Sequence, residues 1–162
     1  MSQGGLANSS GNTLEQTVIA TFSSKGFQVA PYRNWLVNPA SFGGDVLLRR
    51  VPYTSIYGHN GVTEFLAISS RYELNARIEC KWQQSAGSVD EKFPYLYLNC
   101  LERMPEQHII IIVDGGGAKL SAVTWLKTVA AEGRYASATS VQKKIQVFSL
   151  SEFIVWANRT LR

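Results

Sequence analysis

The sequence predicts an α/β domain in which helices flank a mixed β-sheet. The residues alternate between helical and strand-like patterns in the order α-β-β-β-α-β-α-β-α. Two strand-like runs, 64–69 and 76–82, lie on either side of a polar turn and therefore predict a hairpin. The run 108–113 is almost wholly apolar and rich in β-branched residues, which is typical of a central strand covered on both faces.

The first elements are a helix and a short strand. Apolar residues at helical spacing predict a helix over 12–24, capped by Asn12 or Thr13 and ended by Gly26. Residues 27–30 then alternate like a first strand.

The stretch 34–60 is rich in Pro and Gly, and its only apolar burst is 46–48. We expect this stretch to be an extended excursion from the core rather than a linker, because its aromatic residues need burial or a partner.

The elements after the hairpin are regular. Ser88 predicts a capping box that opens a helix over 89–102. A helix at about 121–132, a strand at 144–148 and a last helix capped by Ser151 complete the chain.

The composition is that of one globular domain. The chain has 162 residues, of which 45% are hydrophobic, and this excludes intrinsic disorder. No purely apolar run is longer than the five residues of 109–113, far fewer than the roughly 20 residues of a membrane-spanning helix. We therefore expect a single domain over 12–162, preceded by a flexible segment at 1–11 that is rich in Gly, Ser and Asn.

Cysteine content and charge indicate where the protein acts and what it binds. Cys80 and Cys100 are the only cysteines and cannot form a disulfide framework, which predicts a reducing, intracellular compartment. The net charge of +4 favours a polyanionic partner only weakly, because many basic proteins bind no nucleic acid.

Polar side chains share one face of the second hairpin strand. Because side chains alternate along a strand, Glu79, Lys81 and Gln83 point to the same side. Such a face is costly to bury without partners, so the strand either faces water or holds a site. A carboxylate about 7 Å from an ammonium can bind a hard divalent cation, while the lysine orients or deprotonates a water.

A second carboxylate should come from a neighbouring element, because one carboxylate rarely holds a Mg²⁺ ion. Glu64 begins the partner strand and lies across the turn from Glu79. Glu15, in the first turn of the first expected helix, is a third candidate. Asp45 is the alternative first acid, because it also opens a short apolar strand; residues 50–63 would then be an insertion.

This order of elements and acids resembles the PD-(D/E)XK nuclease superfamily. The resemblance rests on an acid in the first helix, an acid on the second strand of a meander and Glu79-Cys80-Lys81 on the third, followed by a helix and a strand. It covers roughly 12–115 and implies a restriction-endonuclease-like fold, with an αβββαβ core and an extra C-terminal α-β-α. Glu64 departs from the Pro-Asp or lone Asp that is usual in the family's first motif.

The resemblance implies a metal-dependent DNA endonuclease that hydrolyses phosphodiester bonds, with Mg²⁺ or Mn²⁺ as the cofactor. The carboxylates of Glu64 and Glu79 and the backbone carbonyl of Cys80 would hold the metal, and Lys81 would position a water. The full set of catalytic candidates is Glu64, Glu79, Lys81, Glu15 and Gln83.

The expected partner is DNA, double-stranded or branched, with no membrane; a homodimer would allow both strands to be cut. The DNA-binding candidates are Arg49, Arg50, Tyr53 and Lys92. The motif looks most like those of small phage-type or mobile-element members, which would act in the cytoplasm of a bacterial host. Composition does not separate DNA from RNA. The alternative function is a catalytically silent module that binds DNA or another protein.

Overall fold

The computed structural model describes residues 3–139 and 141–162, with side chains from residue 12 onward. Its centre is a six-stranded mixed sheet in the order β1-β2-β3-β4-β5-β6. The strands are β1 (Gln28–Pro31), β2 (Asp45–Thr54), β3 (Asn60–Ser69), β4 (Leu74–Trp82), β5 (His108–Asp114) and β6 (Lys144–Phe148). Strands β2, β3 and β4 form an antiparallel meander, and the remaining neighbours pair in parallel. The predicted fold class is therefore confirmed.

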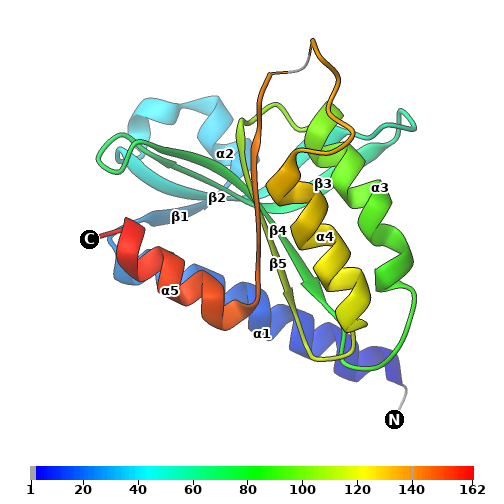
Figure 1. Ribbon diagram of the computed structural model, residues 1–162. Helices are drawn as coiled ribbons and strands as arrows, with labels where there is room; N and C mark the ends of the chain where they lie inside the picture. Colours follow the sequence, from blue (N-terminus) through cyan, green and yellow to red (C-terminus); the bar gives the residue numbers. More distant parts are fainter. Residues whose placement is uncertain (1–2, 140) are drawn as a thin grey trace.

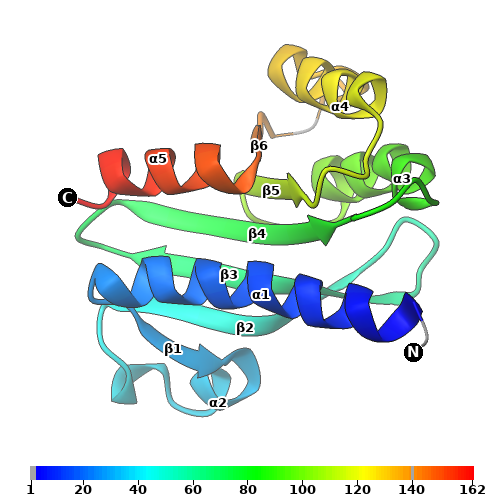
Figure 2. The same cartoon turned by 90° about the horizontal axis from the view of Figure 1, so that it is seen from below.

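Helices cover both faces of this sheet (Figures 1 and 2). The helices are α1 (Gln3–Ser24), α2 (Tyr32–Val37), α3 (Val89–Glu102), α4 (Leu120–Glu132) and α5 (Leu150–Thr160), with a short 3-10 helix at Pro39–Ser41. Helices α1 and α5 pack on one face, whereas α3 and α4 pack on the other, beside α2. None of the described helices is long and apolar enough to cross a membrane.

The alternation of side chains in β4 and β5 builds the two cores. Ile78, Ile110 and Ile112 point towards α1 and α5, whereas Ile109 and Ile111 point towards α3 and α4. All five side chains are fully buried, and burial of each contributes about 1.5–3 kcal/mol. The prediction that β5 is a central strand covered on both faces is confirmed.

Helix α1 begins at Gln3 rather than near residue 12. The expected start of this helix at residue 12 is therefore wrong, because residues 3–11 are also helical, while residues 1–2 lie outside the described residues. Gly, Ser and Asn have low helix propensity, but each costs less than about 1 kcal/mol. A helix that already exists over 12–24 gains one backbone hydrogen bond per added residue without a new nucleation cost.

The expectation that 34–60 leaves the core is wrong for residues 45–54. Residues 45–54 form β2, which lies between β1 and β3, and both Leu47 and Leu48 are fully buried. Strand β1 pairs with β2 only as far as Arg49. Pro52, which lacks an N–H, therefore lies where this side of β2 has no partner strand.

Two predicted helix caps are corrected by the structure. Ser88 precedes α3 but forms no side-chain capping bond. The capping box of α5 is made by Ser149 and Glu152, whose side chains bind each other's backbone N–H groups. Ser151 lies inside that helix instead of capping it.

Candidate active site

Strands β3 and β4 separate at one end, and an acidic side chain fills the gap. Their ladder ends at the Phe65–Ile78 pair. Beyond it, the Glu64 carboxylate accepts a hydrogen bond from the backbone N–H of Cys80 at 2.7 Å. Glu64 thus replaces the strand carbonyl that this N–H would otherwise bind, which fixes its carboxylate beside β4.

Glu79 is buried in this gap and is only 4% exposed. Its Oε1 pairs with the ammonium of Lys81, but its buried Oε2 accepts no hydrogen bond from the described residues. Burial raises the pKa of Glu79; the positive charge of Lys81 opposes this shift, and the negative charge of the nearby Glu64 adds to it. When both are ionised, a nearby positive charge such as the Lys81 ammonium offsets their repulsion.

Lys81 connects these carboxylates with solvent, since 29% of its side chain is exposed. Burial alone would lower the pKa of Lys81, but the charges of Glu79 and Glu64 raise it overall. The ammonium therefore stays charged at neutral pH, beside two carboxylates and within reach of water. This is the chemistry needed to orient a water or to offset negative charge.

Glu15 approaches the same region from α1. Burial and the charge of Glu64 raise the pKa of Glu15, while two nearby arginines and Lys81 lower it. A cavity of about 290 Å³ opens between these elements. It is lined by Glu15, Arg49, Arg50, Val62, Thr63 and Glu64.

The oxygen donors of the gap fit a hard divalent cation. Glu64 and Glu79 supply carboxylates, Cys80 supplies a backbone carbonyl, and the unpartnered Oε2 of Glu79 is an acceptor in need of a positive partner. Within the described ranges, no three His, Cys, Asp or Glu side chains form a group that could hold a metal. Glu15 therefore does not complete a cluster of three carboxylates, and an ion here would keep several waters.

The polar groups of Gln83 hold loops beside the site. Its Oε1 accepts the N–H of Val89 at 3.1 Å, and its Nε2 donates to the carbonyl of Gly117 at 3.3 Å. A Cβ at Gly115 or Gly117 would collide with the backbone of residues 83–85. The glycine run after β5 therefore allows the loop after β5 to pack against the loop after β4, and the hydrogen bonds of Gln83 stabilise this contact.

The structure does not bring the alternative acid to the gap. Asp45 pairs in the sheet with Ser69 and binds its hydroxyl, and it forms an ion pair with Arg71 at 3.5 Å. Ser69 is five residues from Glu64 along β3, roughly 17 Å at the rise of a strand. Lys92 is exposed in the first turn of α3.

Tyr53 lies close to the charged pair, over the backbone of β3. A Cβ at Gly61 would come within 2.5 Å of the Tyr53 ring, so the glycine makes room for it. Burial and then the charge of Glu79 raise the pKa of Tyr53 to about 12. Its hydroxyl is therefore protonated at neutral pH and can donate a hydrogen bond near Glu79.

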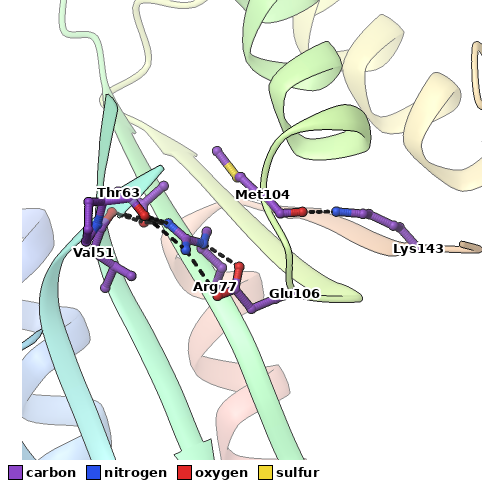
Figure 3. Close-up of polar contacts among 7 residues, drawn as sticks. Val51, Thr63, Arg77, Met104, Glu106 and Lys143 are labelled. Carbon is purple, nitrogen blue, oxygen red and sulfur yellow. Dashed lines mark hydrogen bonds and ion pairs between the residues drawn. The ribbon is translucent and has the colours of Figure 1, made fainter. Parts of the chain in front are cut away.

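A buried arginine lies on the face of β4 that carries Glu79 and Lys81, and the sequence interpretation did not include it. Arg77 is 2% exposed and forms a two-bonded ion pair with Glu106, at 2.5 Å from Nε and 3.1 Å from Nη2 (Figure 3). Its Nη1 donates to Thr63 Oγ1 at 3.0 Å and to the carbonyl of Val51 at 3.2 Å. The alternation that grouped Glu79 with Lys81 also includes Arg77, so the signal was present.

Arg77 holds β2 just after a kink. Arg50 has a φ of 57°, a left-handed conformation that costs a non-glycine residue about 1–2 kcal/mol. The β2–β3 register passes from Arg49–Phe65 to Val51–Thr63 without a pair between them. The kink places Arg49 and Arg50 along the cavity that contains Glu64, and the bonds from Arg77 stabilise this arrangement.

Comparison with models of known protein families gives a match over most of the chain. The family model of the PD-(D/E)XK nuclease superfamily domain matches residues 6–161. No curated protein and no solved structure matched significantly. The matched segment contains every residue of the gap described above and extends beyond the part of the chain that carries the sequence resemblance.

Proposed function

The chain belongs to the PD-(D/E)XK nuclease superfamily, and on that basis we propose that it is a divalent-metal-dependent DNA endonuclease. One observation carries the proposal: Glu79 is buried beside Glu64 and Lys81, and its Oε2 has no partner among the described residues. An unpaired buried carboxylate oxygen is costly in a purely structural ion pair. In a metal site, the same atom is a ligand.

The side chains of the gap have different roles in the proposed reaction. Glu64, Glu79 and the carbonyl of Cys80 would hold Mg²⁺ or Mn²⁺. Such an ion polarises the scissile phosphate and lowers the pKa of a water bound to it. Lys81 orients the attacking water and offsets the negative charge that develops on the phosphate. The protonated hydroxyl of Tyr53 offers a further donor on the same side.

The hydrogen bond from the N–H of Cys80 to the Glu64 carboxylate favours a functional role for Glu64 over a purely structural one. The Glu64 carboxylate occupies a place that a strand carbonyl would normally fill. This arrangement keeps the two strands apart and gives the acid a fixed position relative to Glu79. A fixed pair of carboxylates, rather than a flexible one, is what binding of one ion requires.

A substrate panel tests the function. Plasmid, linear, nicked and four-way-junction DNA, with an RNA duplex beside them, are incubated with Mg²⁺, Mn²⁺ or EDTA. Cleavage of at least one DNA that requires the metal and stops in EDTA is the expected result. Metal-dependent cleavage of the RNA alone would replace the DNA assignment. Binding without cleavage under every condition would support the catalytically silent module instead.

Salt dependence tests where DNA lies. Each phosphate contact contributes about 0.9 to the slope of log affinity against log salt. Arg49→Ala with Arg50→Ala removes two charges from the cavity wall, so we expect the slope to flatten by up to about 2. Fluorescence anisotropy of a labelled duplex in EDTA at several salt concentrations measures the slope without cleavage.

Arg159→Ala with Arg162→Ala is the charge-matched control, because both arginines are exposed near the end of α5. This control should leave the slope close to that of the wild type. An unchanged slope in the Arg49/Arg50 variant would place DNA elsewhere, with the basic pair Lys143 and Lys144 as the next surface to test.

A further inference from the structure

A second cavity, of about 410 Å³, opens on the other side of Arg49 and Arg50. It is lined by Pro31, Tyr32, Arg33, Arg49 and Arg50. Three of these residues are arginines and none is acidic. The volume lies within the range of about 300–1,000 Å³ that is usual for ligand sites. We call this hollow the arginine cavity.

The side chains of the three arginines of this cavity form no hydrogen bond or ion pair among the described residues, although Arg49 and Arg50 lie near the carboxyl group of Glu15. Elsewhere Arg71, Arg77 and Arg134 each form an ion pair with a carboxylate. By contrast, no hydrogen bond or ion pair joins Arg33, Arg49 or Arg50 to another side chain in the part of the chain that the structure describes. Each guanidinium therefore keeps five N–H donors in the planar fork that suits a phosphate.

The position of the arginine cavity relates it to the carboxylates. Arg49 and Arg50 line this cavity and also the smaller one that contains Glu15 and Glu64. The two hollows therefore share a wall, which the kink at Arg50 creates. Arg33 lines only the arginine cavity, so a substitution there can test it without altering the carboxylate side.

We propose that the arginine cavity binds a second phosphate of the nucleic acid, next to the one cleaved, and that Arg33 is the residue specific to it. The inference rests on the proposed function, because it takes the ligand to be the same strand that reaches Glu64 and Glu79. Consecutive phosphates of one strand fit two hollows with a common basic wall. The ring of Tyr32 offers a surface for the attached sugar or base.

An inorganic anion tests the cavity apart from nuclease function. Inorganic pyrophosphate is titrated into the metal-free protein, and binding is followed by the chemical shifts of backbone amides. We expect the largest shifts at Arg33, Arg49 and Arg50. Arg33→Ala should weaken binding about tenfold or more, because a charge-assisted, two-bonded contact is lost. Arg33→Lys should recover only part of it, and Arg159→Ala should change nothing.

A modified duplex then tests whether the anion is a phosphate of DNA. Single methylphosphonate linkages, which are uncharged, are placed one at a time along a short duplex, and binding is measured in EDTA. One neutral linkage should weaken binding by the wild type about tenfold but leave binding by Arg33→Ala unchanged. A duplex with a 5′-hydroxyl in place of a 5′-phosphate forms a second arm. If Arg33→Ala becomes insensitive to a methylphosphonate linkage, the cavity binds an internal phosphate. If it becomes insensitive to loss of the 5′-phosphate, the cavity binds a terminal one.

The outcomes separate the two proposals. Wild-type binding of pyrophosphate at these arginines without any binding of DNA would retain the anion site but refute its assignment to a substrate strand, together with the proposed function. If every modification weakens DNA binding by Arg33→Ala as much as it weakens binding by the wild type, the proposal for the arginine cavity is refuted, but the proposed function is not. Shifts confined to residues outside the cavity refute it as well.

Discussion

Glu79→Ala is expected to lower the rate of DNA cleavage by about 10³-fold or more, the largest effect that we predict for any single substitution. The substitution removes a buried carboxylate whose free oxygen is the proposed ligand, so binding of Mn²⁺ should weaken with it. Single-turnover cleavage of plasmid measures the rate, and calorimetric titration with Mn²⁺ measures binding. Glu79→Gln, which keeps the shape of the side chain, should lose activity to a similar extent.

Lys81→Ala distinguishes water positioning from metal binding. It should also lower the cleavage rate by about 10³-fold, while Mn²⁺ binding persists because no ligand is removed. Lys127→Ala is the matched control, because Lys127 pairs with Glu152 at an exposed site. This variant should cleave DNA like the wild type. Wild-type cleavage by the Lys81 variant would show that the ammonium only neutralises Glu79.

Glu106→Ala should destabilise the fold by about 3–5 kcal/mol, because it leaves the guanidinium of Arg77 buried without its counter-charge. Arg77 is 2% exposed and binds β2 and β3 as well as Glu106. Urea unfolding followed by circular dichroism measures the free energy of unfolding.

Two further variants show whether the buried charge is the cause. Lys127→Ala breaks the exposed ion pair with Glu152 and should cost no more than about 1 kcal/mol. Arg77→Met with Glu106→Leu removes both charges at once, and it should cost less than Glu106→Ala alone. A Glu106→Ala cost below about 1 kcal/mol would mean that Arg77 finds another partner or water.

The hairpin was predictable because its signals are local. Residues 64–69 and 76–82 alternate clearly around a polar turn, and the structure pairs them in the Phe65–Ile78 register. The alternation also predicted that Glu79 and Lys81 share a face. It could not show that the strands part beyond Phe65, because that separation depends on the Glu64 carboxylate binding the N–H of Cys80.

Strand β2 was not predictable in the same way. Its pattern is broken by Arg49, Arg50 and Pro52, which are normally found outside interior strands. The structure accommodates them because the pairing of β1 with β2 ends at Arg49 and because Arg77 binds the carbonyls of Val51 and Pro52. Contacts between residues so far apart in the sequence leave no local pattern.

The arginine cavity likewise depends on tertiary structure. Arg33 is the second residue of a six-residue helix that the sequence interpretation did not include. Only the parallel pairing of β1 with β2 brings it beside Arg49. Arg77 is different, because alternation in β4 alone would have placed it with Glu79. Its partner Glu106 lies 29 residues away in the sequence, so the pairing itself could not be foreseen.

Anomalous scattering from crystals grown with Mn²⁺ tests the central claim most directly, namely that this gap between β3 and β4 holds the catalytic ion. We expect one peak between the carboxylates of Glu64 and Glu79, within coordination distance of Glu79 Oε2, and we expect it to vanish in Glu79→Gln. No peak there, in crystals of protein that cleaves DNA with Mn²⁺ in solution, would contradict the assignment. A peak held by other residues would do the same.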